Sequence, residues 1–177
     1  VWNAETIADG KLPDDLIDGH QSPITKLVYA KQSKEIVSSD SNGKVLIWDE
    51  TSRPHLLVQK EKKIASLALS LDETLVYIAE ADGTISCLDK STKEVKFTLP
   101  SLGSDPQTIV ASRTANETIY VLFWDEIVCV SNGAPAKRTK VKGYEATALE
   151  VNEALGEVLI GDKRGKLHIL DMNLEQK

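Results

Sequence analysis

The sequence of 177 residues has few of the features that mark several common classes of protein. It contains two cysteines and three scattered histidines, too few for a disulfide scaffold or a zinc site. Aromatic residues make up 5% of the chain, and no apolar run approaches the ~20 residues of a membrane-spanning helix. The first residues also do not show the basic and then apolar pattern of a signal peptide. These absences predict a cytoplasmic protein.

An excess of basic residues is missing as well. The 21 Lys and Arg residues are outnumbered by 27 Asp and Glu residues, which gives a net charge of -6 and a pI near 5.1. Proteins that bind nucleic acid usually carry a clustered basic excess, so this balance argues against such a partner. The densest basic segment has Lys137, Arg138, Lys140 and Lys142, with Thr139 between them. This alternation favours a solvated edge strand over an anion site.

What the sequence does contain is an internal repeat, seen best in segment 38–49 (SSDSNGKVLIWD). Asn42 and Gly43 separate two strand-like runs and predict a two-residue hairpin turn. Sliding the sequence by 40 residues places Gly43 on Gly83, a third copy follows after 42 residues, and the fourth matches the second at an offset of 82. No helical period interrupts the pattern. Four strands in each unit of about 40 residues are typical of β-propeller blades.

These offsets also predict the boundaries of the repeats. We expect 1–18 to hold the tail of a preceding repeat and an outer strand, followed by repeats at 19–58, 59–99, 100–141 and 142–177, the last with an incomplete outer strand. Cys87 and Cys129 take the same strand position in consecutive repeats. Neighbouring sheets pack about 10 Å apart, which is too far for a disulfide, so both thiols are expected to be buried and reduced.

Four such blades would leave apolar faces open at both ends of the array, near 24–30 and 167–170. Exposed apolar faces of this kind aggregate or find partners. We therefore expect the chain either to pair with a second copy, which would give an eight-bladed ring, or to be the ordered part of a longer protein.

The dipeptides Gly19-His20 and Trp48-Asp49, together with the 40-residue period, resemble the WD40 family of β-propellers. The resemblance implies an all-β fold of about four four-stranded blades and a non-enzymatic role in binding other proteins. In that family a His, a strand Ser or Thr, a turn Asp and a Trp form a hydrogen-bonded row that braces each blade. The matching positions of this structural repeat network are His20, Ser38, Asn42 and Trp48.

Longer stretches resemble one branch of the family, the two-propeller WD-repeat proteins that help cofilin to dismantle actin filaments. The stretches are GHQSPITKL with NGKVLIWD, the shortened hairpin VLFWDEIVCV, and KGYEATALEVN leading into GEVLIGDKRGKLHIL. The resemblance implies actin and cofilin as partners and a location at the cytoskeleton. The open alternative is a scaffold subunit of another multiprotein complex.

A propeller hydrolase is the alternative from a different class of function. His20 is a candidate catalytic base, and Asp40, Glu80 and Asp82 are candidate carboxylates for acid and base chemistry. A bracing role for the His and turn capping by the carboxylates are the structural explanations for the same residues. We favour these, and we assign no catalytic residue, metal or cofactor.

The most distinctive aromatic residue is Trp124, which we place at the apex of a two-residue hairpin turn where Asn-Gly or Asp-Gly is usual. Two interpretations stay open: contact with a partner protein, since Trp is a common interface anchor, or packing onto the neighbouring loop. In WD40 propellers this turn shares a face with the loop before each inner strand. The candidate partner-binding face carries Gln21, Ser22, Lys62, Lys63, Trp124, Tyr144, Glu145 and Arg164.

Overall fold

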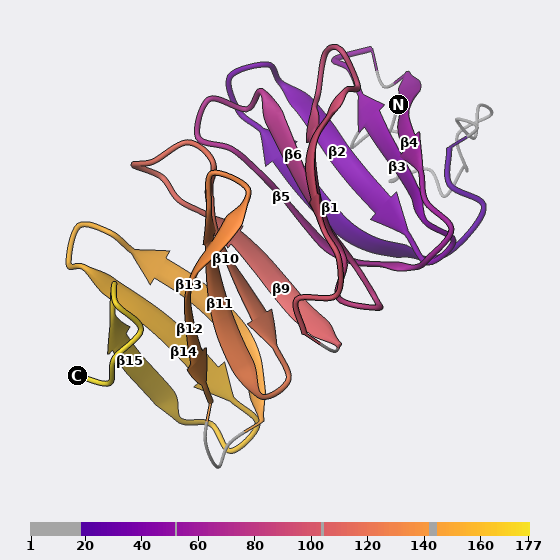
Figure 1. Ribbon diagram of the computed structural model, residues 1–177. Coiled ribbons are helices and arrows are strands. Elements are labelled where there is room, and N and C mark those ends of the chain that lie inside the picture. The colour runs from indigo at the N-terminus through magenta and orange to yellow at the C-terminus, as the bar shows by residue number, and fades with distance from the viewer. Residues whose placement is uncertain (1–18, 52, 104, 142–144) are drawn as a thin grey trace, which may run out of the picture.

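The computed structural model describes residues 19–177 apart from 52, 104 and 142–144 (Figure 1). Over these residues the chain forms strands and turns but no helix, and so no helix that could cross a membrane. The described strands make four antiparallel sheets, three with four strands and one with three. The predicted all-β fold is therefore confirmed. The tail and outer strand expected within 1–18 lie outside the described residues.

In every sheet the strands lie side by side in the order of the sequence, as consecutive hairpins require. Sheet 1 contains β1 (Ile24–Ala30), β2 (Glu35–Asp40), β3 (Lys44–Trp48) and β4 (Pro54–Gln59). Sheet 2 contains β5 (Ile64–Leu69), β6 (Leu75–Glu80), β7 (Ile85–Asp89) and β8 (Val95–Leu99). Sheet 3 contains β9 (Pro106–Ala111), β10 (Thr118–Phe123), β11 (Glu126–Ser131) and β12 (Ala134–Lys140), and sheet 4 contains β13 (Ala146–Asn152), β14 (Glu157–Asp162) and β15 (Leu167–Asp171).

Glycine is required in the turn between the second and third strands of sheets 1 and 2. The turn in sheet 1 spans three residues, 41–43, and Gly43 alone among them has a positive φ, of 84°. The prediction of a two-residue turn was therefore wrong, because Gly43 takes the left-handed position of a longer loop. A Cβ on Gly43 would lie 2.3 Å from the carbonyl oxygen of Lys60, and one on Gly83 would lie 1.7 Å from that of Gly103. The linker to the next sheet thus packs directly on the turn.

The aspartate at the end of the third strand, or directly after it, caps the turn that follows. Asp49 accepts a hydrogen bond from the backbone N–H of Thr51 at 2.8 Å, and Asp89 accepts one from Thr92 at 2.8 Å. Asp171 occupies the same place in sheet 4 and also bonds to backbone N–H groups. A side-chain oxygen that satisfies turn N–H groups explains why aspartate recurs at this point of the repeat.

The four sheets are arranged in an arc with their first strands on the inside (Figure 1). Strand β1 lies beside β5, β5 beside β9, and β9 beside β13. Hydrophobic cores of the described residues fill the spaces between successive sheets. Between sheets 1 and 2, for example, Val37 and Ile47 pack with Val76 and Ile78, all nearly fully buried. Packing of each sheet on the next is therefore the main source of stability.

The outer faces of the end sheets expose apolar side chains. On sheet 1, Leu27 and Tyr29 are 59% and 60% exposed, and on sheet 4 Leu167 is 62% exposed. Leu170, which was expected on the open face, is instead buried against sheet 3. Side chains alternate across a strand, so Leu167 and Leu170 lie on opposite faces of β15.

Candidate functional site

A buried polar network connects the second and third strands of sheet 1 to the segment before β1. The Nδ1 atom of His20 lies 2.8 Å from Asp40 Oδ2, and its Nε2 atom lies 2.6 Å from Ser38 Oγ. Trp48 donates its indole N–H to the same Ser38 oxygen at 2.6 Å. Because an ionised carboxylate accepts only, His20 donates from Nδ1 to Asp40 and accepts from the Ser38 hydroxyl at Nε2. The side chains of His20 and Asp40 are 3% and 1% exposed.

The structure brings together the side chains of His20, Ser38 and Trp48, three of the four residues predicted for this network, but not that of Asn42. Asp40 occupies the carboxylate position that the sequence analysis gave to Asn42. The loop of three residues places Asn42 at the exposed tip, where its backbone N–H donates to Asp40 Oδ1 at 2.9 Å. The N–H of Lys44 donates to the same atom at 3.0 Å. Burial raises the pKa of Asp40, but these N–H groups and His20 outweigh burial and hold it below its usual range.

The same carboxylate position is occupied in sheets 2 and 4. Glu80 lies 40 residues after Asp40 and pairs with Lys60 at 3.0 Å, and Lys60 lies 40 residues after His20. In sheet 4, Asp162 Oδ2 lies 2.9 Å from His168 Nε2, and this contact lowers the pKa of Asp162. Three sheets therefore keep a buried carboxylate next to a basic side chain, although the basic residue differs.

Two of these carboxylates share a sequence pattern that marks the turn. Asp40 and Asp162 both begin the pattern Asp-x-x-Gly-Lys, at 40–44 and 162–166. Asp162 accepts the N–H groups of Arg164 and Lys166, as Asp40 accepts those of Asn42 and Lys44. Matching the repeats on this pattern identifies the turn aspartate that the Asn-Gly dipeptide obscured.

The candidate catalytic groups are engaged in contacts within the protein, and the side chains of His20 and Asp40 are almost fully buried. Both ring nitrogens of His20 are engaged, and Asp40 binds His20 and two turn N–H groups. Glu80 is paired with Lys60 inside sheet 2. Asp82 pairs with Lys62 at 2.7 Å, and this contact lowers the pKa of Asp82 to about 2. The arrangement suits bracing and turn capping.

The loop face is the surface formed by the hairpin turns between second and third strands and by the segments before the first strands. Trp124 lies there, in the turn between β10 and β11, and is 38% exposed. The Lys163 ammonium lies 4.3 Å from the centre of a Trp124 ring and 2.7 Å from Glu145 Oε2. Trp124 therefore packs against the neighbouring turn, as one of the two interpretations expected, and still exposes part of its ring.

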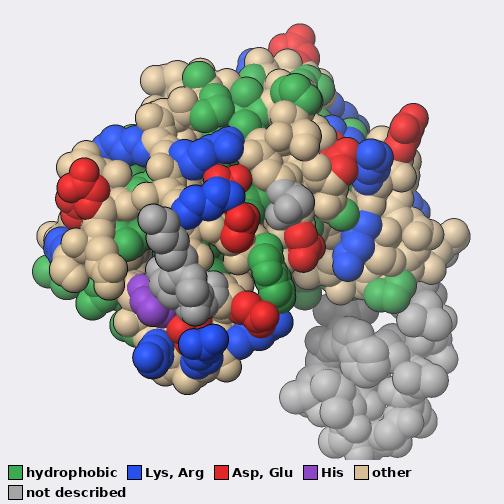
Figure 2. All heavy atoms as spheres, turned by 60° about the horizontal axis from the view of Figure 1, so that its bottom comes forward, with side chains coloured by type: hydrophobic (Ala, Val, Ile, Leu, Met, Phe, Trp, Pro, Cys, Tyr) green, Lys and Arg blue, Asp and Glu red, His purple; other side chains and the backbone are tan. Residues whose placement is uncertain are grey.

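The other predicted residues of the loop face are spread across the sheets. Gln21 and Ser22 border a polar hollow of about 510 Å³ that Asn42, Gln59 and Glu61 also line. Figure 2, which looks onto the loop face, shows basic and acidic side chains interspersed. Lys62 pairs with Asp82, and Lys63 and Arg164 are exposed. Tyr144 lies outside the described residues.

Lys137, Arg138 and Lys140 belong to an edge strand, as predicted, whereas Lys142 lies outside the described residues. Strand β12 pairs with β11 on one side only. Lys137 donates to the carbonyl oxygen of Met172 at 3.0 Å, Arg138 to that of Leu102 at 2.9 Å, and Lys140 to Asp125 at 2.6 Å. These side chains connect sheet 3 to adjacent segments and do not converge on a shared anion site.

The two cysteines are free and buried, as predicted. Burial raises the pKa of Cys87 to about 12 and also raises the pKa of Cys129. Thiolates are the metal-binding and nucleophilic form, so both side chains act as small apolar groups. Within the described residues no cluster of His, Cys, Asp and Glu is arranged to hold a metal ion.

Comparison with known proteins identifies the architecture. No protein-family model matches the sequence, and no curated protein is significantly similar to it. Among 1387 solved chains that match the structure is the β-propeller domain of Cps50 (Swd1) from Myceliophteria thermophila, with a TM-score of 0.74. The two sequences are 19% identical over 89% of this chain, which spans 55% of that domain. The four sheets are thus successive blades of a β-propeller fold.

Proposed function

We propose that this chain is part of a WD40-type β-propeller and serves as a non-enzymatic protein–protein interaction module. The observation that carries the proposal is the contrast between its buried and its exposed polar groups. The side chains of His20, Asp40 and Glu80 are engaged in contacts with other residues of the protein. On the loop face, by contrast, Trp124 and Arg164 are exposed, and Trp and Arg are typical energetic anchors of protein interfaces.

The partners that we propose are actin and cofilin, in the form of cofilin-decorated filaments whose disassembly the protein would promote. The support is the resemblance of the stretches 19–27, 42–49, 121–130, 142–152 and 156–170 to actin-interacting protein one. The loop face also has the mixed charge that suits a protein surface, with Lys62 beside Asp82 and Lys163 beside Glu145.

Co-sedimentation with bare and cofilin-decorated actin filaments tests this proposal. We expect the chain to pellet with decorated filaments and expect Trp124→Ala with Arg164→Glu to weaken that binding by at least about tenfold. Lys34→Glu is the matched control, because Lys34 is exposed in the turn between β1 and β2, at the opposite end of the strands. Sedimentation no greater than that of the chain alone would refute actin and cofilin as partners.

A second candidate function is a scaffold subunit of another complex. The observation in its favour is how widely the fold is shared, since 1387 solved chains match it. Proteins with one fold commonly have unrelated partners. A folded chain that ignores actin filaments but loses its binding to another purified protein in the Trp124 and Arg164 variant would favour this candidate.

A further inference from the structure

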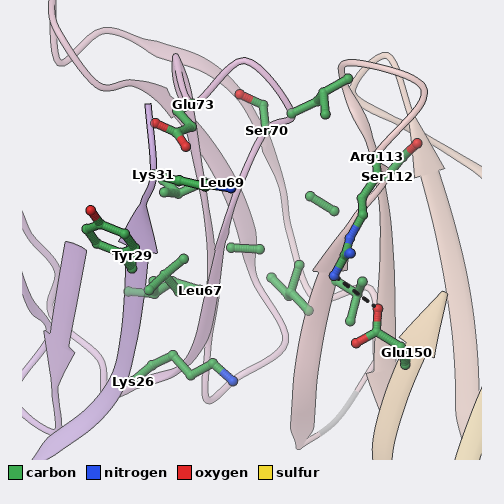
Figure 3. Close-up of a pocket in the computed structure, with 16 residues that line it drawn as sticks. Lys26, Tyr29, Lys31, Leu67, Leu69, Ser70, Glu73, Ser112, Arg113 and Glu150 are labelled. Atoms are coloured by element: carbon green, nitrogen blue, oxygen red, sulfur yellow. Dashed lines mark ion pairs between the residues drawn. The ribbon is translucent and has the colours of Figure 1, made fainter. Parts of the chain in front are cut away.

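A groove of about 570 Å³ runs along the inner strands of sheets 1 to 3 (Figure 3). Its walls come from β1, β5 and β9, and Glu150 of β13 borders it on one side. The groove lies away from the loop-face residues considered above. An inference about it therefore goes beyond the proposed function.

The middle of the groove is apolar. Leu67, Leu69 and Val110 form part of its lining, and Tyr29 stands at its edge with 60% of its surface exposed. In Figure 3 the Leu67 side chain lies between those of Lys26 and Lys31, and Leu69 lies at the level of Lys31. A ligand that follows the strands would therefore meet an apolar surface flanked at each end by an ammonium group.

The charges around the groove are not balanced. Glu73 is engaged by the backbone N–H groups of Gln32 and Ser33 at 3.0 and 3.1 Å. Glu150 lies 3.6 Å from Arg113, so these two opposite charges are paired. Within the described part of the chain, no ion pair involves Lys26 or Lys31.

Because Glu73 keeps its negative charge, the groove lining carries three basic residues and two acidic ones, a small positive excess in a chain whose net charge is -6. Lys26 is half-buried and Lys31 is exposed, so both ammonium groups are within reach of a ligand. Figure 3 shows the Lys26 side chain extending across the opening toward β9. An anionic group bound here would gain attraction that the rest of the acidic surface does not offer.

We propose that the groove binds an extended segment of a partner protein that carries aliphatic side chains between two acidic residues. The aliphatic side chains would cover the half-buried Leu69 and Val110, and the two carboxylates would pair with Lys26 and Lys31. The lysines are five residues apart, and because Lys31 lies just beyond the end of β1 their Cα atoms are at most roughly 17 Å apart. The acidic residues of the segment should therefore also lie about five positions apart.

The test is fluorescence anisotropy with a fluorescein-labelled peptide, Gly-Glu-Leu-Ser-Leu-Ser-Glu-Gly, and the intact chain. We expect saturable binding at ~0.1 M salt that weakens as salt is raised, because exposed ion pairs are screened. Replacing both Glu residues of the peptide by Gln should weaken binding about threefold to tenfold. Replacing both Leu residues by Ser should weaken it by a similar factor, since the apolar contact is lost.

The protein variant that tests the site is Lys26→Glu with Lys31→Glu, which should weaken binding at least about tenfold because attraction becomes repulsion. Lys34→Glu with Arg53→Glu is the control, since both residues are exposed outside the groove and outside the loop face, and the change in net charge is the same. Far-UV circular dichroism checks that both variants are folded.

Absence of saturable binding, equal binding of the Gln peptide, or equal loss in the control variant would each overturn the proposal. Filament co-sedimentation by the Lys26 and Lys31 variant separates this site from the loop face. Loss of peptide binding with unchanged filament binding supports a distinct groove site.

Discussion

Removing the indole of Trp48 should destabilise the protein more than removing that of Trp124. Trp48 is half-buried, its Nε1 donates to Ser38, and a Cβ on Gly19 would lie 2.4 Å from its ring. Replacing a core Trp by Ala costs about 3–5 kcal/mol, and partial exposure places Trp48→Ala near the lower end, at about 3 kcal/mol. The substitution also removes the indole N–H that donates to the Ser38 hydroxyl, which itself bonds to His20.

Trp124→Ala should cost less, about 1–2 kcal/mol. The Trp124 ring is 38% exposed, and its specific contact is the ammonium of Lys163 at 4.3 Å. Such a cation–π contact contributes about 0.5–1 kcal/mol at an exposed site. A third variant, Trp48→Phe, keeps most of the ring and removes the N–H donor, and should cost about 1–2 kcal/mol.

Urea unfolding followed by far-UV circular dichroism measures these differences. Fluorescence is unsuitable because each substitution removes an emitting residue. Equal m-values would show that the variants differ in stability rather than in the surface exposed on unfolding. If Trp124→Ala cost as much as Trp48→Ala, or if Trp48→Phe cost nothing, the assigned role of the polar network in sheet 1 would be wrong.

Three further predictions concern ionisable groups. Cys87 and Cys129 should react with a thiol reagent at pH 8 only as fast as the protein unfolds, and rapid labelling of native protein would contradict their burial. Glu80→Gln should destabilise the protein by about 1–3 kcal/mol in the same urea assay, because it leaves half-buried Lys60 without its partner. Asp82→Asn should cost below about 1 kcal/mol, because the pair of Asp82 with Lys62 is exposed. Stability should fall as pH drops below about 4, because the folded-state pKa of Asp40 is lowered and its carboxylate stabilises the protein only while it is ionised. If Asp40→Asn kept the full acid dependence of stability, Asp40 would not be a contributor.

Strand positions were largely predictable from the sequence. Strands Ile24–Ala30 and Val95–Leu99 coincide with alternating apolar and polar segments, whereas Lys44–Trp48 contains a continuous apolar run that is buried on both faces. Alternation works because one face of each strand packs on a neighbouring sheet while turn residues end the run. The start of β12 was less clear, since its Lys and Thr alternation begins later than the strand. The dipeptide Asn132-Gly133, with φ values of 50° and 72°, marks the turn that begins it.

The candidate site was predictable only where a residue keeps its chemical type. His20, Ser38 and Trp48 match a known pattern, and the structure brings them together. The pairing of Lys60 with Glu80 preserves charge but not residue type, so a search for histidine misses it. The contact of Lys163 with Trp124 depends on how two blades pack, and no spacing within one repeat encodes it.

Contacts between turns of successive blades indicate how blades without the full polar row are held. Glu73 of sheet 2 accepts the N–H groups of Gln32 and Ser33 in sheet 1, and Glu153 of sheet 4 accepts the N–H of Arg113 in sheet 3. Each donor lies at or next to a turn, where the strand ladder leaves backbone N–H groups to be satisfied by side chains. Because the acceptor comes from the next sheet, such a turn is completed only when that sheet is in place. Nearest-neighbour terms of this kind make the folding of one blade depend on the next, so stability is distributed along the array and does not reside in each repeat alone.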